Sequence, residues 1–217
     1  MHPQEQPPHG LKPGFAVPAT DDEIREKYLE RAIRELNTLT RELQGCEHCP
    51  RGNLMPVLGS GHPQADIFLL KFGPRPAEVE EGVAFYGRAG SALMKSFKRL
   101  DIDPLTVYGT LCVKCPVSDP SLADPACIGR LVEELAIVQP KLVVVMGDDA
   151  LAVLNDLDVP LARPLTPEPG TVQRFTPSTE VLYVPNIDEA LDDEAAKRGF
   201  WTAFRALGAW HEALPPY

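Results

Sequence analysis

The sequence predicts an α/β protein with three layers, in which helices cover both faces of a central four-stranded parallel sheet. Two observations support this fold class: short apolar runs that are typical of buried strands, and helical patterns that lie between them. Strands that alternate with helices favour a parallel sheet that is buried on both faces. The four expected strands are residues 66–72, 106–113, 141–146 and 181–184.

The expected helices follow the apolar periodicity of the segments between these strands. Thr20 or Asp21 can cap a first helix that runs to about Leu43. Ligands of such sheets usually bind beyond the carboxyl ends of the strands, so the residues after each strand are the candidates for chemistry. Further helices are expected at 91–100, 125–137, 148–154 and 200–214.

Length and composition describe an ordinary but acidic chain. It has 217 residues, with 21 Lys and Arg against 31 Asp and Glu, and a net charge of −10. We expect a single domain over 20–217 that follows a proline-rich tail at 1–19. The apolar runs are too short for a membrane span and the first residues lack a signal-peptide pattern, so we expect a cytoplasmic protein without a membrane partner. In that compartment the five cysteines are free thiols, metal ligands or catalytic groups rather than disulfides.

The cysteines form two alternative ligand sets. Cys46 and Cys49 have the spacing of a chelating pair, and Cys112 and Cys115 look like a second pair, so these four predict a zinc-bound protein-interaction module. However, Cys112 lies inside an apolar strand pattern, whereas Cys127 lies near the start of a helix. The alternative set of Cys46, Cys49, Cys115 and Cys127 suits either zinc or a [4Fe-4S] cluster, and spacing does not choose between them.

Several segments together resemble the iron–sulfur (family 4) uracil-DNA glycosylases over about residues 40–208. The similar segments, in chain order, are 46–70, 82–108, 113–115 and 139–151, together with a cysteine that opens a helix. The resemblance implies the four-stranded parallel sheet described above. It also implies a structural [4Fe-4S] cluster on Cys46, Cys49, Cys115 and Cys127, with Cys112 as a core residue.

The resemblance also places the catalytic positions of the family on apolar residues. Such enzymes hydrolyse the N-glycosidic bond of a uracil that is flipped out of DNA. Their polar positions fall here on Phe72, Leu111 and Val184. Phenylalanine cannot act as a base, and leucine offers the uracil edge no hydrogen bond. The other expected base-pocket residues are Gly73, Pro74, Phe85, Gly87 and Asn186, and the resemblance implies that the ring of Phe85 stacks on the base.

Loss of the polar positions on an intact scaffold predicts a pseudoenzyme related to base-excision repair. Such a protein would lack ordinary uracil excision and would act by binding DNA, a nucleotide-like ligand or a protein partner. The alternative is an active glycosylase with altered base specificity, which uses Asp188 or Asn186. We expect Lys71, Asn186 and Asp188 near the pocket mouth as solvated groups.

The charge distribution predicts weak DNA binding. Residues 82–100 form a locally basic stretch, whereas residues 121–217 hold 15 acids against 7 bases. Five of these acids lie in 188–194, which corresponds to the loop that contacts DNA in the family, and they would repel phosphates. The candidate DNA contacts are Lys71, Arg88, Lys95, Lys98 and Arg99.

Overall fold

The computed structural model describes residues 20–119 and 122–215, so the expected tail at 1–19 lies outside the described residues. The strands are β1 (Ser60–Gly61), β2 (Ile67–Lys71), β3 (Val107–Leu111), β4 (Leu142–Met146), β5 (Val172–Arg174) and β6 (Glu180–Val184). The helices are α1 (Asp21–Gln44), α2 (Pro76–Glu81), α3 (Arg88–Arg99), α4 (Pro125–Val138), α5 (Asp148–Asp156), α6 (Ile187–Ala190), α7 (Glu194–Phe204) and α8 (Ala206–Glu212), with a 3₁₀ turn at Pro104–Thr106.

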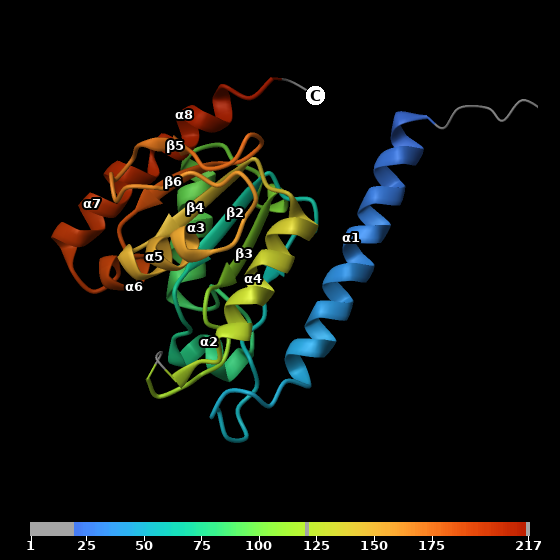
Figure 1. Cartoon of the computed structure of the whole chain (residues 1–217). Helices are drawn as coiled ribbons and strands as arrows, with labels where there is room; N and C mark the ends of the chain where they lie inside the picture. The colour runs from blue at the N-terminus through green and yellow to red at the C-terminus, as the bar shows by residue number, and fades with distance from the viewer. Residues whose placement is uncertain (1–19, 120–121, 216–217) are drawn as a thin grey trace, which may run out of the picture.

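The sheet has the strand order β1-β3-β2-β4-β6-β5 (Figure 1). Its four inner strands, β3, β2, β4 and β6, pair in parallel, which confirms the predicted four-stranded parallel sheet. Two short strands that the sequence does not predict, β1 and β5, pair antiparallel at the two edges. Both are too short to give an alternating apolar pattern.

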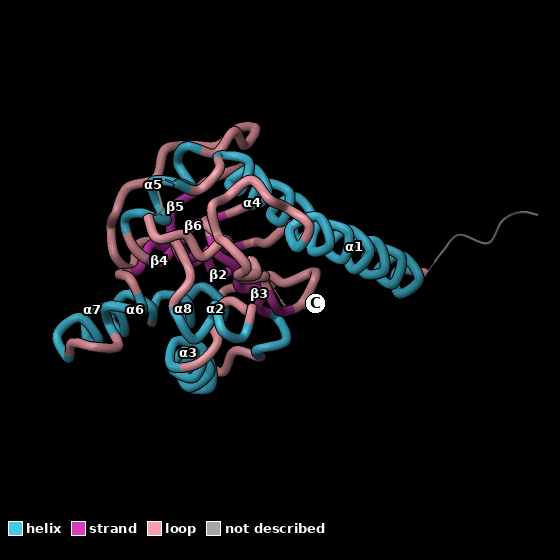
Figure 2. The backbone as a smooth tube through the Cα atoms, turned by 90° about the horizontal axis from the view of Figure 1, so that it is seen from below, coloured by secondary structure: helices cyan, strands magenta, loops and turns pink. Residues whose placement is uncertain are grey.

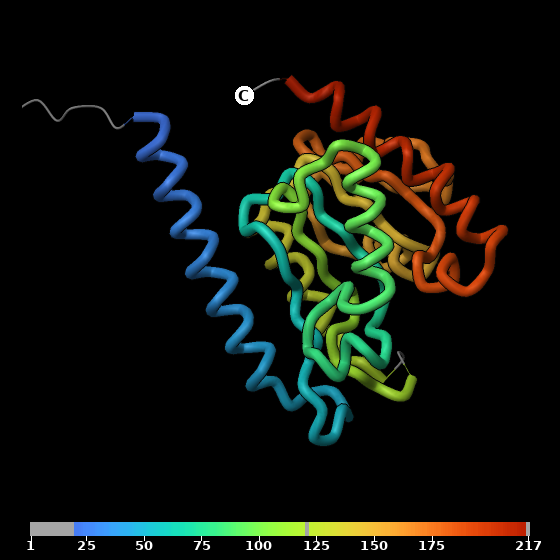
Figure 3. The backbone as a smooth tube through the Cα atoms, turned by 180° about the vertical axis from the view of Figure 1, so that it is seen from behind, coloured from blue at the N-terminus to red at the C-terminus, as the bar shows by residue number. Residues whose placement is uncertain are grey.

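Helices cover both faces of the sheet, and alternate strand residues point to opposite faces. Along β4, Leu142, Val144 and Met146 pack on one side, whereas Val143 and Val145 pack on the other. Figure 1 views the face that α4 and α5 cover, and α1 lies outermost, beside α4 (Figure 2). Figure 3 shows the opposite face with α3, α7 and α8. We call the two apolar clusters the α3-side core, which includes Leu69, Phe97 and Phe204, and the α4-side core, which includes Phe68, Leu131 and Leu154.

Local sequence explains where several helices begin. Thr20 and Glu23 form a reciprocal capping box at the start of α1. The side chain of Asp124 caps α4, and Pro125 occupies its first turn, where a missing N–H costs nothing. The sequence predicts one helix over 200–214, whereas the chain begins α7 earlier, where Asp193 caps it, and continues after Arg205 as α8.

The register of the parallel strands aligns their last residues in one row. Lys71 of β2 lies between Leu111 of β3 and Met146 of β4, and Met146 pairs with Val184 of β6. Leu111, Met146 and Val184 belong to the α3-side core, so the row ends the sheet as an apolar floor with a single charged member. Within residues 20–119 and 122–215, no helix is long and apolar enough to cross a membrane.

Candidate base pocket and cysteine site

A cavity of about 890 Å³ lies beyond the carboxyl ends of the parallel strands. The loop after β2 forms one wall, and the loop after β3 forms another. Its lining includes the predicted pocket residues Phe72, Gly73, Pro74 and Asn186, together with Lys71, Arg75, Asp149 and Asp188. This is the location that the sheet topology predicts for a ligand site.

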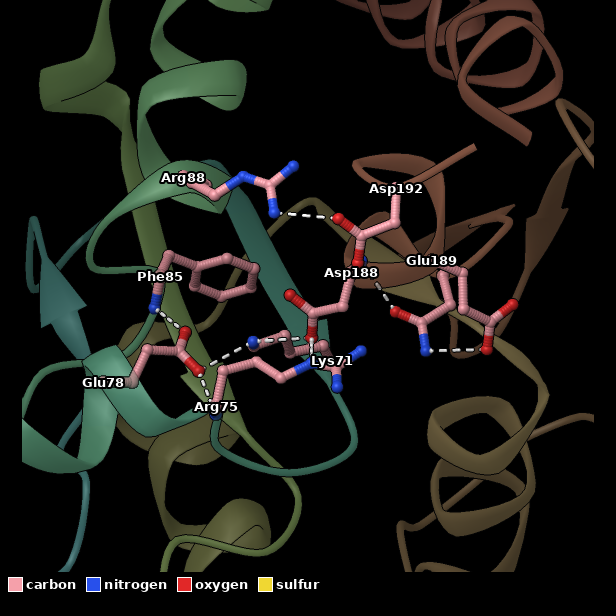
Figure 4. A network of polar contacts seen from close by, with 9 residues as sticks. Lys71, Arg75, Glu78, Phe85, Arg88, Asp188, Glu189 and Asp192 are labelled. Atoms are coloured by element: carbon pink, nitrogen blue, oxygen red, sulfur yellow. Dashed lines mark hydrogen bonds and ion pairs between the residues drawn. The ribbon is translucent and has the colours of Figure 1, made fainter. Parts of the chain in front are cut away.

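A buried network of charges lies between this cavity and the sheet (Figure 4). Lys71 is only 1% exposed, and its Nζ lies 2.8 Å from Glu78 Oε2 and 2.9 Å from Asp188 Oδ2. Arg75 Nε contacts the same Asp188 oxygen at 3.1 Å from the solvent side. The two cations and two carboxylates therefore balance one another, as burial of charge requires.

Glu78 connects this network to Phe85, the ring that the resemblance assigns to base stacking. Its Oε1 accepts the backbone N–H of Phe85 at 2.5 Å, and its Oε2 accepts that of Arg75 at 2.7 Å. Phe85 has a left-handed backbone, with φ of 60°. The Lys71 ammonium lies 5.6 Å from the centroid of the Phe85 ring, within the range of a cation–π contact. The ammonium of the protein's own Lys71 therefore lies over the ring of Phe85.

A glycine on the sheet makes room for this ring. A Cβ on Gly109 would lie 2.8 Å from Phe85 Cδ2, so only glycine lets the ring lie against β3 without a shift.

The structure does not bring the three predicted catalytic positions together as a polar site. Leu111 and Val184 are fully buried in the α3-side core, together with Phe85. Phe72 lines the cavity but packs against the α4-side core, on the other face of the sheet. The polar groups that reach the cavity come instead from Lys71 and Asp188 and from neighbouring loop residues.

The expectation that Lys71 and Asp188 are solvated is wrong. Both are buried, because each neutralises the other and Glu78 completes the network. A lysine within the apolar run that forms β2 is the sequence signal for such a pair, but its partner Asp188 lies 117 residues away. Asn186 does line the cavity, and its side-chain oxygen accepts the N–H of Asp188 at 3.0 Å, which starts α6.

The candidate DNA contacts lie in different environments. The buried ammonium of Lys71 cannot reach a phosphate unless its ion pairs open. Arg88 follows Gly87, the N-cap of α3, and binds Asp192, while Arg99 stacks over the Trp201 ring at 5.5 Å. Lys95 and Lys98 are exposed on α3.

Three of the five cysteines converge. The sulfur atoms of Cys49, Cys115 and Cys127 all lie within 4.8 Å of one another, and all three residues are buried. Cys46 is partly exposed and is not part of this group. The backbone N–H of Asp124 donates to Cys49 Sγ at 3.3 Å.

The cysteines of this group perturb one another. Hydrogen bonding with Cys115 and with the backbone of Lys114 lowers the pKa of Cys127. Hydrogen bonding with Cys127 and burial raise the pKa of Cys115. Clustered, buried sulfur donors with amide hydrogen bonds fit a soft metal ion or an iron–sulfur cluster. Cys46 is the cysteine available as a fourth ligand.

Cys112 differs from the other cysteines. It is fully buried in the α4-side core, and burial raises the pKa of its thiol to about 12. It packs in a different cluster from Cys49 and Cys115, so the structure does not bring these three together as the zinc set requires.

A second buried ion pair braces the segment that carries Cys115. Lys114 is fully buried, and its Nζ lies 2.7 Å from Glu134 Oε2 on α4 and donates to the carbonyl of Leu111 at 2.8 Å. Glu134 also accepts the hydroxyls of Tyr108 and Thr110. These contacts fix the path of the chain from the end of β3 to the sulfur group.

The family model of the uracil DNA glycosylase superfamily matches residues 58–205, more than half of the chain, and the chain belongs to this superfamily. A type-4 uracil-DNA glycosylase from Pyrobaculum aerophilum is 28% identical over 133 residues, which are 57% of this chain and 66% of that protein. The aligned part thus spans just under two thirds of that relative, and the chain is a family-4-like member of the superfamily.

Proposed function

We propose that this chain is a DNA-repair-related homologue of the glycosylases that binds DNA without ordinary uracil excision. The position of Lys71 is the observation that carries the proposal. Its ammonium lies over the ring of Phe85, held by Glu78 and Asp188. A base stacked on that ring would have to displace the ammonium and separate a buried ion pair, at an energetic cost of about 3 to 5 kcal/mol.

The residues around this ring support the same proposal. Leu111 and Val184 present only methyl groups, so a uracil edge would lose its hydrogen bonds to water without gaining any from them. Phe72 has no group that can orient or deprotonate a water molecule. Asp188, the carboxylate on which an altered specificity would depend, is engaged by Lys71 and Arg75.

We further propose that Cys46, Cys49, Cys115 and Cys127 hold a [4Fe-4S] cluster, with zinc on the same residues as the alternative. The buried sulfur group and the family-4-like relative support the iron–sulfur assignment. The cluster would serve as a structural link between the loop after α1 and the loop after β3, within one domain over 20–217.

Equilibrium binding to two matched oligonucleotides tests the binding role. Single-stranded DNA that contains one uracil and the same strand with thymine should bind with dissociation constants that agree within about twofold, since Leu111, at the position that reads the base in the family, offers the uracil edge no hydrogen bond. A preference for uracil of tenfold or more would contradict the proposal. Alkali cleavage at any other base after incubation would favour the glycosylase with altered specificity.

A further inference from the structure

The acidic segment, defined here as residues 187–194, is tied to the opposite side of the pocket by three cations. Its inner contact is Asp188, which binds Lys71 at 2.9 Å and Arg75 at 3.1 Å. Its outer contact is Asp192, whose Oδ1 lies 2.8 Å from Arg88, and Arg88 also donates to the Leu191 carbonyl at 2.7 Å. Figure 4 shows Arg75 and Arg88 reaching toward this segment from different elements.

A cleft of about 310 Å³ lies between α2, the start of α3 and the acidic segment, and its lining includes Asp188, Leu191 and Asp192. Arg75 and Arg88 both contribute to it, and their side chains are 53% and 70% exposed. Tyr86 also lines the cleft and is 50% exposed. Two accessible guanidinium groups beside an accessible aromatic ring are the elements that bind a single-stranded nucleotide, through its phosphate and its base face.

We propose that this cleft is a binding site for one nucleotide of single-stranded DNA, and that Asp192 occupies the position of its phosphate in this structure. The inference rests on the proposed DNA-binding function and adds the site and its regulation. Arg75 and Arg88 would bind backbone phosphate, and Tyr86 would stack on a base. The carboxylate of Asp192 competes with phosphate for Arg88.

The outer contact, between Asp192 and Arg88, is the one that a phosphate can replace. Arg88 and Asp192 are both highly exposed, so their ion pair contributes little to stability and opens readily. Asp188 is buried against Lys71 and stays in place. DNA would therefore displace Asp192 first, and removal of that carboxylate should increase affinity for DNA.

Fluorescence anisotropy with labelled oligothymidylate tests this arrangement. Asp192→Asn should bind about three- to tenfold more tightly than the unmodified protein, with a log–log salt dependence steeper by up to about one unit, since one more arginine contacts phosphate. The matched control is Glu194→Gln, which removes the same charge from the same segment. Within residues 20–119 and 122–215, the Glu194 side chain pairs only with Lys197. This control should change affinity by less than about twofold.

Two double variants distinguish release of Arg88 from a general loss of negative charge. Adding Arg88→Gln or Tyr86→Ala to Asp192→Asn should abolish the gain. An equal gain in Asp192→Asn and Glu194→Gln, or a gain that survives Arg88→Gln, would overturn the proposed site. If the unmodified protein binds and Asp192→Asn binds no better, the site fails while the binding function stands. If no variant binds at low salt, both fail.

Discussion

Replacing Lys71 with methionine is expected to lower the free energy of unfolding by about 3 to 5 kcal/mol, because Glu78 and Asp188 would remain buried with one cation too few. In a domain of this size, that loss corresponds to a fall in Tm of roughly 10 °C. Denaturant unfolding followed by circular dichroism measures the effect. The triple variant with Glu78→Gln and Asp188→Asn should recover a large part of the loss, since it removes the unpaired charges along with their partner.

A surface lysine provides the matched control for this prediction. Lys197 pairs with Glu194 at 3.1 Å, and both side chains are exposed, so Lys197→Met should cost less than about 1 kcal/mol. Equal effects of Lys71→Met and Lys197→Met would contradict the buried network. A triple variant that is no more stable than Lys71→Met would show that charge balance does not explain the stability.

The cysteine substitutions are expected to divide into two classes with large differences in metal content. Cys115→Ser and Cys127→Ser should each remove most of the bound iron, because each takes one sulfur from a group whose members lie within 4.8 Å of one another. The unmodified protein, purified anaerobically, should be brown and contain about four irons per chain. Iron analysis and visible absorbance provide the measurements.

Cys112→Ala is the matched control for these variants. Its thiol lies in the α4-side core, and its raised pKa of about 12 keeps it protonated, so its loss should leave the iron content unchanged. Loss of iron in Cys112→Ala, or its retention in Cys127→Ser, would contradict the ligand assignment. A colourless protein with one zinc per chain would favour zinc on the same residues.

The parallel sheet was predictable because each inner strand is buried on both faces and therefore forms a continuous apolar run. Such a run can be recognised in the sequence without knowing which strand pairs with it. The edge strands and α2 were not, because Ser60–Gly61 and Val172–Arg174 are too short for a periodic pattern. Helix α2 spans only six residues and begins after Arg75, which is not one of the usual N-cap residues. The edge strands depend on pairing, and α2 depends on packing, that only the folded chain supplies.

The cavity lies beyond the carboxyl ends of the parallel strands, where such a sheet predicts a ligand site, but the charged groups that line it were not predictable. The apolar residues at 72, 111 and 184 indicate that the expected polar groups are missing. The polar groups present at the cavity include Asp188. It contacts Lys71 only because the carboxyl ends of β6 and β2 lie at the same edge of the sheet. A lysine inside a strand pattern signals a buried partner, but no local pattern identifies that partner.

For the cysteines, spacing left Cys112 and Cys127 as alternative members of the ligand set. The structure distinguishes them, because Cys112 is buried in the α4-side core and Cys127 is buried with Cys49 and Cys115.

A single-turnover excision assay tests the central claim most directly. An excess of the protein, with its iron content verified, is incubated with single- and double-stranded DNA that contains one uracil, and strands are then cleaved at abasic sites with alkali. An active uracil-DNA glycosylase serves as the positive control. The buried Lys71 network and the apolar row beside it predict no cleavage above the protein-free background. Robust cleavage at uracil by the unmodified protein would contradict the account.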